Sequence, residues 1–159
     1  MSEKKQTLIL KKGKNHIINT TLIQKYQMIS FSKIEIEFLN KMEACRIATS
    51  HNNIPHIKPV SCLFEDELFV IATDYDTRMF KNLKENPRAA LSIDVYKDKS
   101  HKAVCIQGKV TIIENGKEFS RLYKKFHDRF EWVRTQPWKE NEAPFIIVKP
   151  LTKSSWGLE

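Results

Sequence analysis

The chain has 159 residues, of which 41% are hydrophobic and 29% are charged. This composition is typical of one globular domain with its own core and excludes a disordered chain. No apolar run approaches the roughly 20 residues of a membrane-spanning helix, and the polar start lacks the apolar segment of a signal peptide. Three widely spaced cysteines, Cys45, Cys62 and Cys105, argue against a disulfide framework and for a reducing, cytoplasmic setting.

The net charge of +8 is unevenly distributed. Residues 1–33 carry seven lysines and one acidic residue, whereas residues 34–159 carry 20 basic and 18 acidic side chains. A basic arm can bind nucleic acid, but a solvated lysine-rich tail is the commoner case, so no nucleic-acid partner is expected. We therefore divide the chain into a basic leader, residues 1–31, and a folded domain, residues 32–159.

The first half of the domain predicts one helix and three strands. Ser32 and Glu35 have the spacing of a capping box, and the apolar stripe that follows predicts a helix over 33–43. Short strands are expected at 45–50, 54–64 and 68–72, with turns at 51–53 and 65–66, which suggests an antiparallel meander.

The second half predicts a short helix over 77–86 that Pro87 ends, and two strands over 89–96 and 103–113. A helix marked by spaced aromatic residues from Phe119 to Val133 follows, then a polar loop and a last strand over 145–148. Six short strands with few helices favour a small antiparallel β-barrel, which removes exposed sheet edges. The fold class is thus mostly β with flanking helices (α+β).

The most informative segment runs from Thr73 to Arg88. A strand ends at Thr73 and a helix starts near Thr77, with Arg78 and Lys81 close by. Free N–H groups at a helix start, a hydroxyl and two cations make a plausible phosphate site. From the residues alone, an ordinary capped helix with solvated basic side chains is an equally good interpretation.

The order of these motifs resembles the pyridoxamine 5′-phosphate oxidase-like, FMN-binding split-barrel family. The resemblance covers about residues 33–156 and rests on five pieces in order. They are Ile47-Ala48-Thr49 with Pro55 to Val60, Thr73 with Thr77-Arg78, Asn82-Leu83 with Asn86-Pro87-Arg88, Val104 to Val110 with Gly108, and Ile147 to Pro150 with Trp156.

The resemblance implies a six-stranded antiparallel split β-barrel of the flavin-reductase type and a homodimer with cofactor sites between its subunits. FMN is the expected cofactor, with FAD, a deazaflavin coenzyme or haem as alternatives in relatives. Carried over by position, the β-strand residues would line the isoalloxazine edge, namely His56, Ile57, Lys58, Pro59, Val60 and Ser61. Thr73, Thr77, Arg78 and Lys81 would hold the ribityl phosphate, and Trp156 would approach the flavin of this subunit or the other.

Three departures bear on the activity. Met79 stands where many relatives have Lys, Ala103 stands where the oxidase has Gln, and no Arg follows Trp156. We therefore expect a flavin-dependent oxidoreductase that acts on a small molecule and is not a true pyridoxamine-phosphate oxidase. A deazaflavin-dependent reductase and a non-catalytic flavin or haem module are the alternatives.

Other candidate sites are weaker. Five histidines show no zinc-ligand spacing, and four scattered glycines exclude a P-loop or dinucleotide motif. No catalytic acid, base or nucleophile stands out, which suits an enzyme whose cofactor carries the chemistry. The stripe Phe119, Tyr123, Phe126 and Phe130 predicts helix core or a dimer contact, and the loop from Arg134 to Pro144 with Trp138 is either a substrate lid or an ordinary surface loop.

Overall fold

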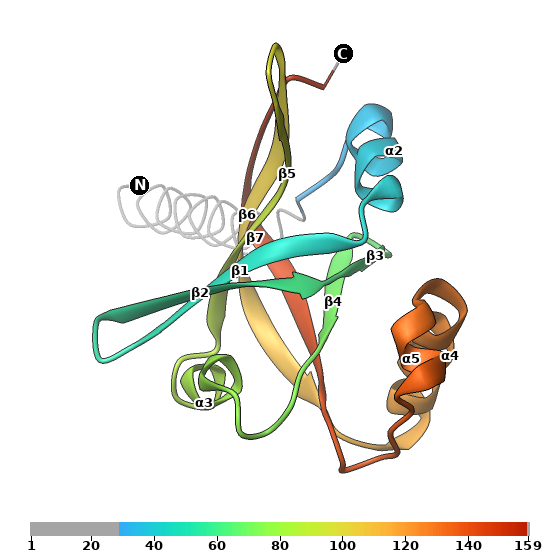
Figure 1. Ribbon diagram of the computed structural model, residues 1–159. Coiled ribbons are helices and arrows are strands. Elements are labelled where there is room, and N and C mark those ends of the chain that lie inside the picture. The colour runs from blue at the N-terminus through green and yellow to red at the C-terminus, as the bar shows by residue number, and fades with distance from the viewer. Residues whose placement is uncertain (1–28, 159) are drawn as a thin grey trace, which may run out of the picture.

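The computed structural model describes residues 29–158 (Figure 1), so most of the predicted basic leader lies outside the described residues. The helices of this part are α2 (Lys33–Lys41), α3 (Arg78–Glu85), α4 (Gly116–Arg129) and α5 (Glu131–Thr135). The strands are β1 (Ala44–His51), β2 (Ile54–Ser61), β3 (Leu63–Glu65), β4 (Leu68–Ala72), β5 (Arg88–Lys97), β6 (Ser100–Ile113) and β7 (Phe145–Trp156). All seven belong to one antiparallel sheet in the order β2-β1-β5-β6-β7-β4-β3.

The two edge strands of this sheet are neighbours in the chain. Only Cys62 separates β2 from β3, although they lie at opposite ends of the strand order. The sheet must therefore curl until its edges approach each other, which gives the predicted split barrel. The single strand expected over 54–64 is wrong, because its first part pairs with β1 and its last part pairs with β4. The three-stranded meander is wrong for the same reason, and the strand count is seven.

Two tight hairpins form, to within one residue, where turn chemistry predicts them. Asn52 and Asn53 join β1 to β2 with φ of 50° and 61°, and Asp66 and Glu67 join β3 to β4 with φ of 50° and 60°. Two consecutive residues in the left-handed region match the right-handed twist of the flanking strands. The second turn lies one residue later than the sequence predicted.

The last strand is longer than expected, because β7 continues past Pro150 to Trp156. Pro150 lies opposite Gly108, where the register of β6 and β7 shifts. Proline has no backbone N–H to donate, and it is tolerated in a strand at such an irregularity of the hydrogen-bond ladder. A Cβ at position 108 would lie 2.6 Å from the carbonyl oxygen of Lys149. Glycine at this position therefore allows the two backbones to approach closely.

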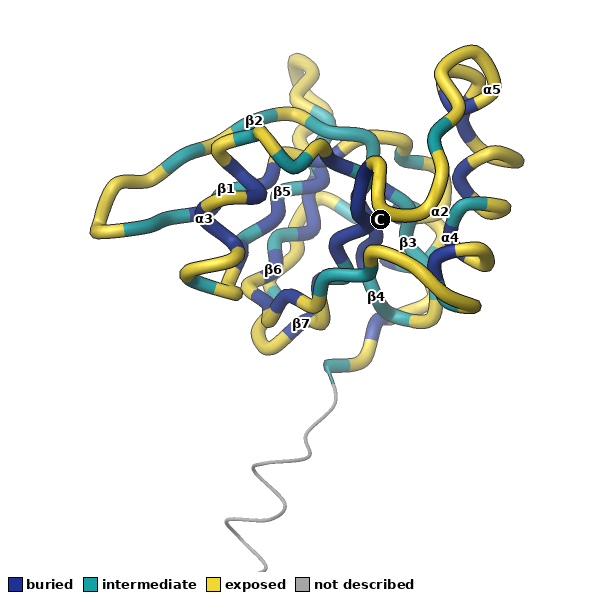
Figure 2. Tube along the Cα trace, turned by 90° about the horizontal axis from the view of Figure 1, so that it is seen from below, coloured by how far each residue is buried: buried dark blue, intermediate teal, exposed yellow. Residues whose placement is uncertain are grey.

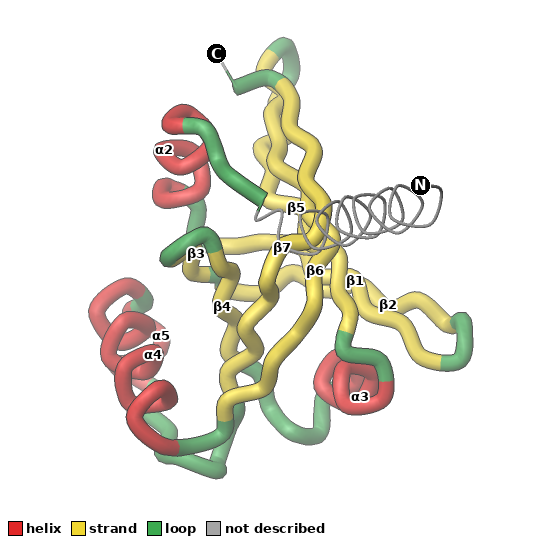
Figure 3. Tube along the Cα trace, turned by 180° about the vertical axis from the view of Figure 1, so that it is seen from behind, coloured by secondary structure: helices red, strands yellow, loops and turns green. Residues whose placement is uncertain are grey.

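The helices pack on two sides of the sheet (Figures 1 and 3): α4 and α5 lie on one side, and α3 lies near the lower end on the other. The barrel interior forms one apolar cluster, and Figure 2 shows its buried strand segments in the middle of the molecule. Phe119, Phe126 and Phe130 form a second cluster with β4 and β7, which confirms the interpretation of the aromatic stripe as core. The predicted single helix breaks at Phe130 into α4 and α5.

Helix α2 is held by a buried charge. The predicted capping box between Ser32 and Glu35 is present, and Glu35 is only 5% exposed. Its carboxylate also accepts hydrogen bonds from Lys153 Nζ (2.5 Å) and Ser155 Oγ (2.7 Å) on β7. Burial alone would raise the pKa of Glu35, but the bonds from Lys153, Ser155 and the Ser32 backbone outweigh it and lower the pKa from 4.5 to about 2.

We predict that Glu35→Gln lowers the free energy of unfolding by about 3 kcal/mol at pH 7, because it leaves Lys153 largely buried without a counter-charge. A carboxyl with a lowered native pKa stabilises the fold above its unfolded pKa. The difference between parent and variant should therefore shrink as the pH falls from 4.5 towards about 2. Urea unfolding at several pH values measures it. Glu37→Gln, on the exposed face of α2, is the control and should change the free energy of unfolding by less than about 0.5 kcal/mol. If the difference between the parent and Glu35→Gln did not depend on pH, the lowered pKa assigned to Glu35 would be contradicted.

Candidate functional site

The segment between β4 and α3 has the local structure that the sequence predicted. Thr77 is the N-cap of α3, and its Oγ1 accepts a hydrogen bond from the backbone N–H of Phe80 at 3.2 Å. The same hydroxyl donates to the carbonyl oxygen of Asp74 at 2.9 Å, so at the 3.0 Å contact between the two threonine hydroxyls Thr73 must be the donor. Thr73 and Thr77 are thus brought together, and the amides of Arg78 and Met79 are left in the first turn without intrahelical acceptors.

The loop that carries this N-cap is fixed at both ends. The Thr73 amide donates to the carbonyl oxygen of Pro144 at 3.2 Å. Tyr75 packs edge-on against Phe80, with ring centroids 5.1 Å apart. Burial and a hydrogen bond to Glu114, at the end of β6, raise the pKa of Tyr75. These contacts hold the start of α3 in one position before any ligand binds.

The two predicted cationic residues face solvent. Arg78 and Lys81 are exposed on adjacent turns of α3, and neither forms an ion pair within residues 29–158. Met79, between them, is fully buried in the barrel core. The residue that departs from the family pattern is therefore a core residue of this chain, and Lys81 is the second cation near the helix start.

Two side-chain amides, one buried and one half-buried, attach α3 to the first hairpin. Asn82 donates to Thr49 Oγ1 at 3.2 Å, and Asn86 donates to the carbonyl oxygen of Ser50 at 3.0 Å. His56 is the cross-strand partner of Thr49, so the two side chains share the face of the hairpin that meets α3. This contact places the phosphate candidate beside the beginning of β2.

Strand β2 divides its predicted cofactor residues between two faces. His56, Lys58 and Val60 point to the side of α3 and the core, whereas Ile57, Pro59 and Ser61 point to the opposite, outer side. Within residues 29–158, β2 is an edge strand that pairs only with β1, so the backbone groups of its other edge have no strand partner in this part of the chain. A flat ligand along this edge can contact residues of both faces.

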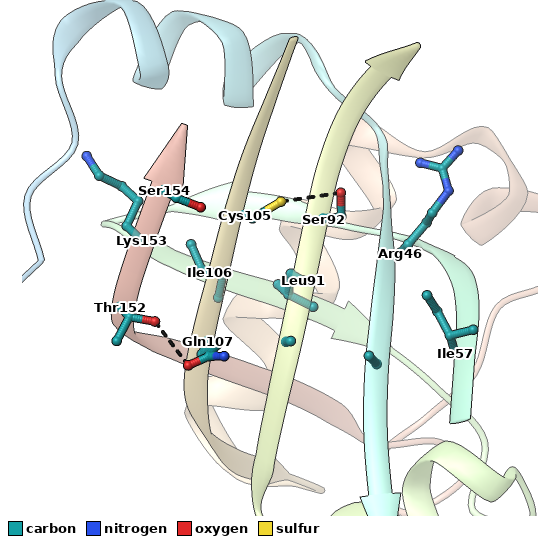
Figure 4. A pocket seen from close by; sticks show the side chains of 12 residues that line it. Arg46, Ile57, Leu91, Ser92, Cys105, Ile106, Gln107, Thr152, Lys153 and Ser154 are labelled. Atoms are coloured by element: carbon teal, nitrogen blue, oxygen red, sulfur yellow. Dashed lines mark hydrogen bonds between the residues drawn. The ribbon is translucent and has the colours of Figure 1, made fainter. Parts of the chain in front are cut away.

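The outer face of the sheet carries a hollow that the sequence analysis missed. It is formed by two adjoining cavities of about 390 and 420 Å³, and small residues on neighbouring strands, Ala48 and Ala90, make their shared floor. Figure 4 shows Cys105 pointing to Ser92 and Thr152 pointing to Gln107 across this floor. The sequence feature that could have revealed the hollow is the presence of small residues at alternate positions of β1 and β5. Only the pairing of the two strands in the sheet brings these residues together.

Charge and apolar surface surround the hollow. Arg88 lies opposite Lys109, and Lys109 lies opposite Lys149, so three exposed cations stand in direct register on β5, β6 and β7. Like charges in this position repel each other. The same face exposes Ile57 (64%) and Leu151 (49%), which is unusual for strand residues of a covered sheet.

Trp156 is not close to the phosphate candidate within one chain. It pairs with Ala103 at the upper end of β6 and is 52% exposed. Figure 1 shows α3 near the opposite, lower end of the molecule.

Among residues 29–158 no group of three His, Cys, Asp or Glu side chains could hold a metal ion. In the same part of the chain, no helix is both long and apolar enough to cross a bilayer.

The comparisons with known proteins agree on the fold. Residues 35–150 match the model of the family described as pyridoxamine 5′-phosphate oxidase. No curated protein matches the sequence. A haem storage protein from Vibrio cholerae is 12% identical with a TM-score of 0.67, and the match covers 77% of this chain and 90% of that one.

Two further solved structures carry names that mention a cofactor. A FAD-binding protein from Mesorhizobium loti is 16% identical with a TM-score of 0.64, and the match covers 79% of this chain and 94% of that one. An F420 reductase is 20% identical with a TM-score of 0.58, and the match covers 74% and 94% of the two chains. At these identities the likeness concerns the fold alone.

We predict that Thr77→Ala lowers the free energy of unfolding by about 1 kcal/mol, because Phe80 N–H and Thr73 lose their acceptor. Chemical denaturation measures the change. Asn115→Ala is the matched control, since Asn115 is the N-cap of α4 but makes no side-chain cap hydrogen bond; its effect should stay within about 0.5 kcal/mol. Equal effects of the two variants would show that the Thr77 hydroxyl does not cap α3.

Proposed function

The chain belongs to the pyridoxamine 5′-phosphate oxidase family, and from that premise we propose that it is an FMN-binding oxidoreductase that acts on a small molecule other than pyridoxamine phosphate. The observation that carries the proposal is the start of α3. There, Arg78 and Lys81 form no ion pair with any residue of 29–158, and they lie beside two amides without intrahelical acceptors and beside the paired hydroxyls of Thr73 and Thr77. A dianionic phosphate monoester is the ligand that such a set of donors suits.

The remaining cofactor residues that we propose, carried over from the family resemblance, lie on β2. His56 lies next to α3, at the phosphate end, and the strand then leads towards Ser61. An isoalloxazine ring along the free edge of β2 would contact the residues from Ile57 to Ser61. A bound flavin supplies the electron transfer, while the residues of this chain bind and orient it.

The proposal excludes the namesake reaction because position 103 holds a fully buried alanine in place of the glutamine of the oxidase. The fold is shared with a FAD-binding protein and an F420 reductase. FAD and a deazaflavin coenzyme are therefore the alternatives to FMN in this proposal. The absorption spectrum of the purified protein, with mass analysis of the released cofactor, distinguishes them.

A haem module is the second candidate. The fold is shared with a haem storage protein, and His56 is half-buried beside α3, where its imidazole would be the residue that holds the haem iron. Haem gives a Soret band, whereas a flavin gives bands in the blue and near ultraviolet. A Soret band that is lost in His56→Ala would favour this candidate over FMN.

We predict that Arg78→Ala weakens FMN binding by about 1.5–3 kcal/mol, the value of a hydrogen bond to a charged group. Fluorescence titration of FMN measures the change in Kd. Lys84→Ala is the matched control, because Lys84 is an exposed cation in the last turn of α3, away from the N-cap. If Arg78→Ala binds FMN as tightly as the parent, the phosphate does not bind at this helix start.

We also propose a homodimer that docks through the outer face of the sheet. This face has the hollow and the exposed Ile57, Leu151 and Trp156. In a two-fold arrangement the row of three cations cannot face its own copy without bringing six like charges together. The cation row of each subunit would therefore face the opposite end of the partner's sheet, which is the end that carries Trp156. In this arrangement Trp156 of each subunit would approach the cofactor site of the other subunit.

We predict that Leu151→Asp shifts the protein towards monomers and weakens FMN binding, because it places a charge in the centre of an apolar interface. Sedimentation velocity over a range of concentrations measures the first effect, and the FMN titration measures the second. Ile34→Asp is the control, since Ile34 is an exposed apolar residue on α2, outside this face. A Leu151→Asp variant with the sedimentation coefficient of the parent would place the interface elsewhere.

Location in the cytoplasm is part of the proposal. Cys45, Cys62 and Cys105 are all free. A hydrogen bond with Cys45, together with burial, raises the pKa of the Cys62 thiol, which makes it unreactive. Free, buried thiols are compatible with a reducing compartment.

A further inference from the structure

The break between α4 and α5 directs a tryptophan to the end of β2. Phe130 ends α4 and caps α5, and Val133 of α5 is fully buried in the aromatic cluster. This anchors the short helix so that Trp132 reaches the last residue of β2. Its indole Nε1 donates a hydrogen bond to Ser61 Oγ at 3.2 Å.

A second tryptophan supports the first from behind. The rings of Trp132 and Trp138 are stacked, with centroids 5.6 Å apart and an interplanar angle of 5°. Trp138 in turn meets Tyr123 edge-on at 4.9 Å and lies 5.6 Å from the ring of Phe145, which is fully buried. The loop that the sequence analysis offered as a lid therefore fixes Trp138 against the core, and the pair forms a rigid aromatic wall.

The front of this wall is open. Trp132 is 37% exposed, although its N–H is bonded to Ser61 and one of its faces is covered by Trp138. The exposed part is thus mostly apolar ring surface that is held in one orientation. A flat conjugated molecule gains both burial and ring stacking on such a surface without having to order it.

We propose that Trp132, backed by Trp138, is the substrate-facing wall of the cofactor site and selects flat, uncharged, conjugated substrates of the quinone type. The inference rests on the proposed function, which places Ser61 beside the flavin ring. The hydrogen bond between Trp132 and Ser61 puts the indole one side chain away from that ring. Trp132, Trp138 and Ser61 carry no charge, so this wall favours a neutral ring over a phosphorylated one.

The test measures binding of menadione, a neutral naphthoquinone, by equilibrium dialysis to the full chain with and without added FMN. Trp132→Leu should weaken menadione binding roughly tenfold, as expected for the loss of one ring stack. Trp132→Phe, which retains a flat ring, should retain most of the affinity. Ser61→Ala should have an intermediate effect, because it frees the indole without removing it.

Tyr96→Leu is the matched control, because Tyr96 is an 83% exposed aromatic residue at the remote tip of the β5–β6 hairpin. Unchanged menadione binding by folded Trp132→Leu overturns the inference, and so does an equal loss of binding for the non-aromatic probe 1,4-cyclohexanedione. If Trp132→Leu does not fold, Trp132→Phe and Ser61→Ala decide in the same way. If the parent binds no FMN, the proposed function fails, and the dialysis without FMN still shows whether Trp132 binds a flat ring.

Discussion

The position of Cys62 between β2 and β3 is the constraint on which the rest of the structure depends. A single residue joins the two edge strands of a seven-stranded sheet, so the sheet has to close on itself far enough for those edges to approach. Within residues 29–158, β2 pairs only with β1. It therefore keeps an edge without a strand partner in this part of the chain, flanked by α3 at its beginning and by α5 at its end. Like β3 at the other end of the strand order, β2 can present both backbone and side chains to a ligand.

The contacts around this strand are of different kinds at its two ends. At the beginning, polar groups fix α3 to the hairpin through Asn82 and Asn86, and cations face solvent. At the end, an aromatic cluster fixes α5, and Trp132 is bonded to Ser61. The charge of the Glu35–Lys153 pair lies elsewhere, between α2 and β7, where it stabilises the fold without touching β2. The buried ion pair is therefore separate from the contacts of β2 with α3 and α5, although Lys153 also lines the hollow on the outer face.

Local chemistry allowed the helix starts and the first tight turn to be predicted from the sequence. The capping box at Ser32, the helix start near Thr77 and the asparagine turn at residues 52–53 depend on neighbouring residues, and all three are present. The break at Cys62, the continuation of β7 beyond Pro150 and the hollow over Ala48 and Ala90 depend on which strands pair, and no local pattern shows that. Trp132 was missed because its role arises from a contact with Ser61, 71 residues away in the chain. The family resemblance supplied the cofactor residues of β2, but the division of these residues between two faces became visible only in the sheet.

The length of strand β2 also sets the length of a ligand that would contact both of its ends. From His56 to Ser61 the strand extends about 17 Å at 3.3–3.4 Å per residue. That length accommodates a phosphate, a sugar-alcohol chain and a fused ring system laid end to end, with the phosphate at α3 and the ring at Trp132. A shorter ligand would leave either Arg78 or Trp132 without a partner. In the proposed function, a cationic end and an aromatic end at this separation would suit an extended cofactor such as FMN better than a compact anion, and the aromatic wall would contact the molecule that the ring reduces or oxidises.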